Sequence, residues 1–325
     1  MSLSLATFSH GLTVEDLIDR TIGHLYGNQR TALNVLDASM TTATTSMTLT
    51  DSLDGIRAGA YIEVDDEVMY VRSATGAVAT VRRGMLGTDA AAHVDESLVK
   101  VEPRFRRQQI IQALRAEIES WPFTVYARYV GEVSVGTSVR GVDLAGLAGV
   151  DGAQLIAAQR SPLESNQTVW PTIPSARLER RQDLTDYPSG YALVFPNFGG
   201  NIGVTDRDWP YGYMVSNVSS FTARVRVKAR FSTAIFSAGT DVGQVMGMPL
   251  ACAEIAPVGA AARLVMTQDV ARTDTNAYGR ARAAEEVRAG DATSAGRSLL
   301  QWRDRLLDEA AKSLFMSEDS WVLQT

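Results

Sequence analysis

The chain has 325 residues and a formal charge of −6, with 45% hydrophobic and 21% charged residues. These proportions are those of a globular protein and exclude wholesale disorder. The acidic balance argues against a dedicated nucleic-acid-binding protein, because such proteins neutralise phosphates with lysine and arginine. The single cysteine, Cys252, excludes an intrachain disulfide and, in practice, a structural zinc site.

The N-terminal residues lack a basic segment followed by a continuous apolar core, so we expect no signal peptide. No run of the sequence approaches the length of about eighteen apolar residues that would span a bilayer. We therefore expect a protein that is made in a cytoplasm and has no membrane partner.

The first predicted elements are a helix and a small β-module. Residues 13–26 place apolar side chains on one helical face, with Thr13 as the N-cap, and residues 33–50 are predicted to be an extended connection or edge strand. Residues 61–101 alternate apolar and polar positions in short runs, which is typical of strands. We interpret their acidic stretch, Asp65, Asp66 and Glu67, as a surface turn rather than a cation site.

A second helix is predicted over residues 104–120, after Pro103. Its arginines lie largely off the apolar stripe: Arg104, Arg106, Arg107 and Arg115. Basic residues in a first turn oppose the helix dipole, so we favour a solvated helix end. A contact with an acidic partner is the alternative interpretation.

Residues 126–238 contain short apolar runs separated by Gly, Pro, Asn and Asp, which predicts a larger β-sandwich-like domain. Residues 221–231 alternate strictly, so a half-exposed strand with a basic outer face is expected. Aromatic residues crowd this region: Trp170, Tyr187, Tyr191, Phe195, Phe198, Trp209, Tyr211 and Tyr213. We interpret them first as core and second as an exposed platform for carbohydrate or protein.

The C-terminal region is predicted to be helical again. A short helix over residues 241–246 ends at Gly247, another piece runs from Pro249 to Pro257, and a small-residue helix covers residues 259–270. A charged loop over residues 273–291 precedes the last helix, residues 293–316. The tail beyond it carries Trp321, Val322 and Leu323, which predicts docking into a partner groove, with fraying as the alternative.

The predicted fold class is therefore α+β, a helical-bundle frame with two inserted β-regions. The expected parts are an N-terminal frame helix (1–32), a small β-module (33–102), a second frame helix (103–125), a larger β-sandwich-like domain (126–238), C-terminal frame helices (239–316) and a docking tail (317–325).

Catalytic signals are thin, and we expect neither an enzyme nor a cofactor or metal. His10, His24 and His93 are far apart without metal-ligand spacing, so each is expected at the surface or in packing. No Walker or dinucleotide-binding motif is present. The only clustered carboxylates for a hydrolase, which we keep as a rival hypothesis, are Asp183, Asp186, Asp206 and Asp208.

Five strings carry a resemblance. They are DDEVMYVRSATGAVATVRRGMLGTDAAAH at residues 65–93, FRRQQIIQALRAEIESWPF at 105–123, YPSGYALV at 187–194, the strand over 221–231, and GMP at 247–249 followed by PVGAAARL at 257–264. Over residues 12–316 the chain thereby resembles head-to-tail adaptor proteins of tailed, siphovirus-like bacteriophages with actinobacterial-type hosts.

The resemblance implies a ring of typically about twelve copies beneath the portal, at the capsid-tail junction of the virion. The implied partners are the portal protein, a head-to-tail stopper or other tail-side connector, further copies of the chain, and capsid proteins, with double-stranded DNA passing through the lumen without sequence-specific binding. Expected portal-binding residues are Leu299, Trp302, Leu306, Phe315, Trp321, Val322 and Leu323, and expected subunit-interface residues are Arg104, Arg106, Arg107 and Trp121. The alternative is a tail or baseplate virion protein with a carbohydrate- or host-binding β-domain.

Overall fold

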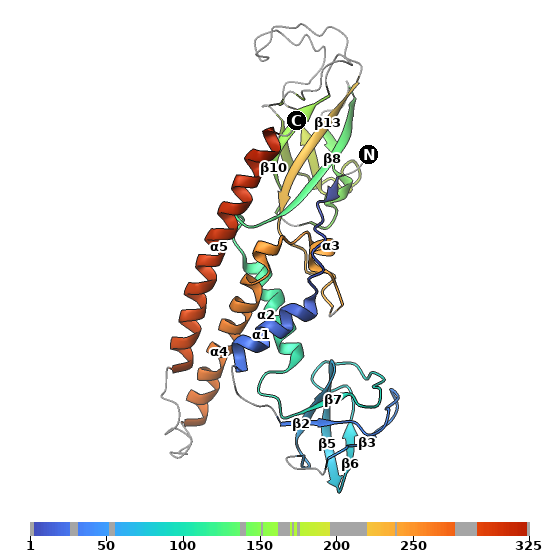
Figure 1. The fold of residues 1–325 in the computed structure, drawn as a ribbon. Helices are drawn as coiled ribbons and strands as arrows, with labels where there is room; N and C mark the ends of the chain where they lie inside the picture. The colour runs from blue at the N-terminus through green and yellow to red at the C-terminus, as the bar shows by residue number, and fades with distance from the viewer. Residues whose placement is uncertain are drawn as a thin grey trace. The chain divides into compact units, whose positions relative to one another are not determined.

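The computed structural model describes residues 3–26, 32–51, 56–136, 141–150, 152–161, 170, 172–173, 176–195, 220–237, 239–276 and 291–323. The described part combines helices with antiparallel sheets, which confirms the α+β class (Figure 1). The chain divides into two compact units. The first comprises residues 1–17, 118–255 and 303–325, and the second comprises residues 18–117 and 256–302.

The first three helices begin and end close to the predicted residues, whereas the last two are longer than predicted. The helices are α1 (Val14–Tyr26), α2 (Arg107–Ser120), α3 (Val242–Met246), α4 (Ile255–Asn276) and α5 (Asp291–Leu323). At the start of α1, Thr13 and Asp16 cap each other, since each side chain accepts a bond from the other's backbone N–H at 3.2 and 2.8 Å. Asp241 caps α3, and Gly247 ends it with a left-handed φ of 64°.

Three helix predictions were wrong in extent. Helix α5 continues through Leu323, so the tail that we expected beyond the last helix is helical as far as that residue. The predicted piece from Pro249 to Pro257 does not end at the second proline. Helix α4 begins at Ile255 and contains Pro257, because proline fits the first turn of a helix, where no N–H is needed. Part of the predicted loop, residues 273–276, belongs to α4, and the remainder up to residue 290 lies outside the described residues.

The second unit contains a six-stranded antiparallel sheet over residues 32–101. Its strands are β2 (Ala32–Val35), β3 (Ser46–Thr48), β4 (Tyr61–Val64), β5 (Glu67–Thr75), β6 (Val78–Arg82) and β7 (Leu98–Val101), in the spatial order β2-β7-β4-β5-β6-β3. The sheet curls until its two edges meet, where Leu36 bridges Leu49. Two backbone bonds of 3.0 Å flank that bridge, from Asp37 to Thr48 and from Thr50 to Val35. We call this curled sheet the barrel.

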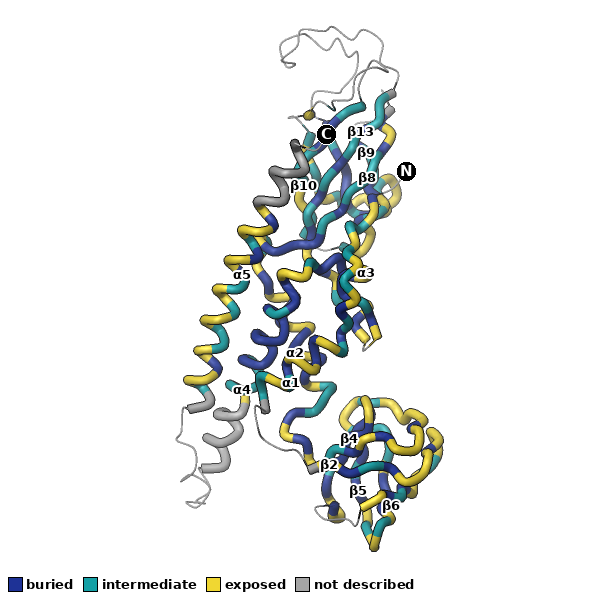
Figure 2. Tube along the Cα trace, viewed as in Figure 1, coloured by how far each residue is buried: buried dark blue, intermediate teal, exposed yellow. Residues whose placement is uncertain are grey.

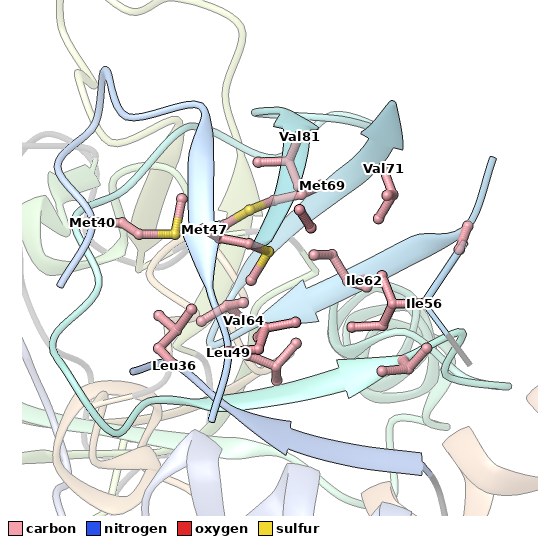
Figure 3. Packing of buried hydrophobic residues seen from close by; sticks show 14 residues of the cluster. Leu36, Met40, Met47, Leu49, Ile56, Ile62, Val64, Met69, Val71 and Val81 are labelled. Atoms are coloured by element: carbon pink, nitrogen blue, oxygen red, sulfur yellow. The ribbon is translucent and has the colours of Figure 1, made fainter. Parts of the chain in front are cut away.

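The barrel has its own hydrophobic core. Figure 3 shows apolar side chains from several strands converging in its interior, among them Met47, Ile62, Met69 and Val81. These four are at most 1% exposed. Each belongs to a strand in which alternate residues point inward, as the period of two in the sequence predicts.

Within the second unit, small residues on α4 let other elements approach closely. A Cβ atom on Gly259 would lie 2.3 Å from Cδ of Glu117 in α2, and a Cβ on Gly296 in α5 would lie 2.4 Å from Cγ of Met266. Glu117 is fully buried, and Arg263 donates to it from Nε at 2.7 Å. The predicted role of this small-residue stretch in close helix packing is confirmed.

We expected no run long and apolar enough to cross a membrane, yet residues 250–267 meet both criteria by length and composition. More than half of this window is buried inside the protein. All residues from Ala256 to Ala262, in the first half of α4, are buried (Figure 2). The window therefore matches the core helix of a folded unit, which passes the same test as a membrane span.

The first unit contains two antiparallel sheets in its described part. One has the order β1 (Ser4–Leu5), β8 (Ala127–Gly136), β13 (Ser220–Ala229), β10 (Gln154–Arg160), and the other the order β11 (Arg177–Arg180), β12 (Tyr191–Val194), β9 (Gly141–Asp143). In β13 the apolar positions Ala223, Val225, Val227 and Ala229 are fully buried. Because Arg224, Arg226 and Lys228 between them are half-buried, the predicted basic outer face is confirmed.

Candidate functional site

Four titratable side chains form one hydrogen-bonded group on the barrel: Asp65, Glu67, Arg83 and His93. We call this group the clasp. Glu67 is buried at its centre, and its two carboxylate oxygens accept bonds from Nε and Nη2 of Arg83 at 2.7 and 2.6 Å. The side chains of Glu67 and Arg83 are 0% and 7% exposed, so the pair is shielded from water. Two-point pairs of this kind are the strongest arrangement of arginine with carboxylate.

The same two side chains also hold the backbone that follows β6. The Glu67 carboxylate accepts bonds from the N–H groups of Gly84 and Ala91 at 2.9 and 3.0 Å. The Nη1 of Arg83 donates to the carbonyls of Thr41 and Thr44 at 2.8 Å each, and Nη2 donates to the carbonyl of Ala91. The guanidinium therefore uses all five of its N–H donors inside the protein.

His93 completes the clasp from the end of the segment 83–93. Its imidazole is 1% exposed, with Nδ1 2.7 Å from Oδ2 of Asp65 and Nε2 2.9 Å from Oε2 of Glu67. Its backbone bridges Met40 through two bonds of 2.8 Å. The segment is thus fixed at both ends, at Arg83 and at His93, onto the same buried carboxylate.

Burial by itself would raise the pKa of Glu67. The hydrogen bonds from Arg83, from the N–H groups of Ala91 and Gly84, and from His93 outweigh that effect and lower this pKa to about 2. The carboxylate of Glu67 is consequently ionised across the whole range in which proteins are normally folded.

The predictions for these residues were wrong for Glu67 and incomplete for His93. Asp65 and Asp66 form the expected exposed turn, with side chains 59% and 61% exposed. Glu67 instead begins β5 on the same strand face as Met69 and Val71, and all three are buried. The spacing of two residues between Glu67, Met69 and Val71 was the sequence signal that Glu67 faces the core. The prediction instead followed its charge, because a charged residue is usually exposed. His93 is neither exposed nor packed as a hydrophobe, because both ring nitrogens meet carboxylates.

A second buried carboxylate joins the barrel to α2. Glu63 accepts a bond of 2.8 Å from the N–H of Arg107, the first residue of the helix, and one of 3.4 Å from Nζ of Lys100. Burial is the largest influence on Glu63 and raises its pKa, although the bond from Arg107 and the charge of Lys100 act in the opposite direction. Nε of Arg107 also donates to Asp66. Two barrel carboxylates therefore compensate the basic first turn of α2.

The expected subunit-interface residues have these positions. Arg107 is engaged within the chain, and Arg106 lies over the ring of Tyr61, 5.0 Å from its centre. Arg104 is exposed, with its guanidinium 5.6 Å from the ring of Phe105. Trp121 is 3% exposed and packs edge-on against Phe231, at 5.7 Å between ring centres. Trp121 is thus a core residue, while Arg104 retains an accessible side chain.

The expected portal-binding residues lie on α5, which is exposed over most of its described length (Figure 2). Between residues 301 and 315, where the burial of its side chains is described, the buried ones are Leu307, Ala310 and Leu314. Trp302 is 40% exposed and meets His24 edge-on at 5.3 Å, and Phe315 is 64% exposed. Leu299 and Leu306 are half-buried, and the side chains of Trp321, Val322 and Leu323 lie outside the described residues.

The basic face of β13 is partly occupied by its neighbours. Arg224 pairs with Glu132 at 3.1 Å and lies 4.0 Å above the ring of Trp170. Lys228 lies 5.6 and 5.4 Å from the rings of Phe123 and Tyr126. These contacts mix charge with aromatic surface in a way typical of cation–π packing.

The other candidate groups show no catalytic arrangement in the described residues. Tyr191 and Phe195 are buried, which confirms the core interpretation for them, and Trp170 and Tyr187 are half-buried. Asp183 accepts bonds from the N–H groups of Thr185 and Asp186 and so forms a local turn. Burial raises the pKa of Cys252 to about 12, which disfavours the thiolate form that a nucleophilic cysteine needs. Phe198, Asp206, Asp208, Trp209, Tyr211 and Tyr213 lie outside the described residues.

Within the described ranges, no group of three or more His, Cys, Asp or Glu side chains is arranged to hold a metal ion. The clasp shows why, since Arg83 and His93 already occupy the oxygens of Glu67. Comparison of the chain with models of protein families gives no match, and comparison with curated proteins gives none.

Proposed function

We propose that this chain is a structural head-to-tail adaptor of a tailed bacteriophage. In this proposal, copies of the chain form a ring, of about twelve subunits, beneath the portal protein. The ring extends the DNA conduit and joins the capsid to a stopper or other connector on the tail side. The helices form the helical-bundle frame of the ring wall, and the barrel and the sheets of the first unit are the two β-regions inserted into it.

The observation that carries this proposal is the surface of α5. A helix of 33 residues is about 50 Å long. Beyond residue 300 it buries only Leu307, Ala310 and Leu314 among its described side chains, while Phe315 remains 64% exposed and Trp302 40% exposed. Large exposed aromatic side chains on a long helix favour contact with another chain. The five sequence strings that resemble adaptor proteins support the same class independently of this surface.

The overall charge supports the same function. With 37 acidic side chains against 31 lysines and arginines, the chain has no excess of cations to hold DNA phosphates. A conduit lined by such subunits lets the duplex slide through it. A carbohydrate-binding tail protein is less well supported, because the described aromatic residues Tyr191 and Phe195 are buried and Arg224 lies over the ring of Trp170.

Binding to the portal protein tests this function. We expect the full chain to co-sediment with portal assemblies from the same virus, and Phe315→Ser to weaken that binding at least tenfold. Leu184→Ser is the matched control, because Leu184 is 62% exposed but lies on a turn between β11 and β12 rather than on α5. Equal binding by both variants, or no binding by the unmodified chain, would contradict the proposal.

A further inference from the structure

The two contacts of His93 place an unusual demand on its protonation. Both ring nitrogens lie within hydrogen-bond distance of a carboxylate oxygen, at 2.7 Å for Asp65 and 2.9 Å for Glu67. An ionised carboxylate only accepts hydrogen bonds, and a neutral imidazole has one nitrogen that donates and one that accepts. Both contacts can be favourable together only when the ring carries two protons and a positive charge, or when a carboxyl group is itself protonated.

The carboxyl groups do not hold that proton. Glu67 accepts four N–H bonds besides the one from His93, and these bonds keep it ionised. Asp65 is 59% exposed, so water solvates its charged form. With His93 charged, the clasp has two negative groups, Asp65 and Glu67, and two positive groups, Arg83 and His93. The charges then balance inside the protein, as buried ionic groups require.

We propose that the clasp is a proton-dependent fastener: the doubly protonated ring of His93 ties the turn at Asp65 to the buried Glu67, and loss of one ring proton at alkaline pH loosens the segment 83–93 while the hydrophobic core of the barrel remains folded. This inference is independent of the adaptor function.

The geometry indicates which contact opens first. Without its second proton, the ring would turn a lone pair toward one carboxylate. Glu67 cannot move away, because Arg83 and two backbone N–H groups hold it. Asp65 can, because it is exposed and lies in a turn with a left-handed φ of 51°. The stabilisation is therefore present while the ring is charged and is lost as the pH rises and the ring loses its proton.

The charged group that shares a carboxylate oxygen with the ring is Arg83, since its Nη2 and Nε2 of His93 contact the same Oε2 of Glu67 at 2.6 and 2.9 Å. The segment between β2 and β3 contributes the backbone of Met40, which bridges His93. The segment that the fastener controls carries the exposed side chain of Leu86, which is 51% exposed and has a left-handed φ of 57°. The protonation of His93 thus controls whether the surface formed by residues 83–93 is held in place or can rearrange.

The protonation state can be measured directly in the unmodified protein. Magic-angle-spinning NMR of the full chain, labelled with ¹⁵N only in its three histidines and sedimented, reports each ring nitrogen even in a large assembly. We expect both nitrogens of His93 to carry protons at pH 7.5, where a free imidazole is mostly neutral. His93→Gln identifies the signals. An unprotonated nitrogen on His93 at pH 7.5 would overturn the proposal.

Hydrogen exchange tests the fastener itself. After correction for the intrinsic exchange rate, we expect the amides of Gly84 and Ala91 to lose protection at least tenfold between pH 6.5 and pH 9, while amides at buried positions of β5 keep theirs. Asp65→Asn removes the charge of the more exposed carboxylate of the clasp and should remove most of this pH dependence without unfolding the barrel. Protection that is independent of pH in the unmodified chain, or equally pH-dependent in Asp65→Asn, would overturn the proposal.

Discussion

Glu67 and Arg83, which are 16 residues apart in the sequence, form a two-point ion pair, and both side chains are buried in the barrel. The pair also fixes the backbone around it. Its carboxylate holds the N–H groups of Gly84 and Ala91, and its guanidinium holds three backbone carbonyls. One buried pair therefore organises a connection that contains no regular secondary structure.

Replacing Glu67 should be costly because it leaves a buried cation unpaired. We expect Glu67→Gln to lower the free energy of unfolding by about 3–5 kcal/mol, measured by chemical denaturation. Asp66→Asn is the matched control, since Asp66 also pairs with an arginine but is 61% exposed, and it should change stability by less than about 1 kcal/mol. Similar losses in the two variants would show that the clasp is not the stabilising group.

Acid should remove the contribution of Glu67. Its pKa falls from an ordinary value of 4.5 to about 2 in the folded protein, so its contribution is complete above pH 4.5 and is lost as the pH falls toward 2. The full effect is roughly 3 kcal/mol. The difference in unfolding free energy between the unmodified chain and Glu67→Gln should therefore shrink between pH 7 and pH 3. A constant difference would contradict this assignment.

Glu63 should behave in the opposite way, because burial raises its pKa. A carboxyl group of this kind favours its neutral form in the folded state, so it costs stability as the pH rises through its raised pKa. Glu63→Gln keeps an acceptor for the N–H of Arg107 and removes the buried charge. We expect the free energy of unfolding of Glu63→Gln, measured by thermal or chemical denaturation, to lie within about 1 kcal/mol of that of the unmodified chain at pH 7. Near pH 4, where the unmodified chain gains stability from its protonated carboxyl group, the variant should be the less stable of the two. A loss at pH 7 as large as that of Glu67→Gln would refute this account.

The close approach of α2 to α4 depends on the absence of a side chain at Gly259. A Cβ atom there would meet Glu117 at 2.3 Å, so Gly259→Ala should lower stability by about 1–3 kcal/mol. Gly23→Ala in α1 is the control. No atom lies within 4 Å of its added Cβ, and alanine should stabilise that helix by about 0.5–1 kcal/mol. Melting temperatures that move in the same direction for both variants would contradict the packing argument.

Local patterns in the sequence predicted the elements well. The capping pair of Thr13 and Asp16 located the start of α1, and strict alternation located the buried face of β13. The clasp could not be predicted in this way, because its members are brought together by strand register rather than by spacing. Glu67 and His93 are 26 residues apart, and only the pairing of β5 with β6 and the return of the chain to Met40 bring them together.

The same limit applies to helix ends. The sequence predicted that the last helix ends at residue 316 and that a tail follows it, yet α5 continues through Leu323. At α2 the sequence showed an uncompensated basic first turn, whereas the compensating carboxylate of Glu63 comes from a strand 44 residues earlier. The start of α2 therefore depends on a tertiary partner that local propensity does not contain.

We propose that the chain assembles as an adaptor ring on a portal. Electron microscopy of the purified full chain, alone and mixed with the portal protein of the same virus, would reveal such a ring. We expect added density on one end of the portal, with rotational symmetry and a central channel wide enough for duplex DNA. A chain that remains monomeric at high concentration and adds no density to the portal would contradict it.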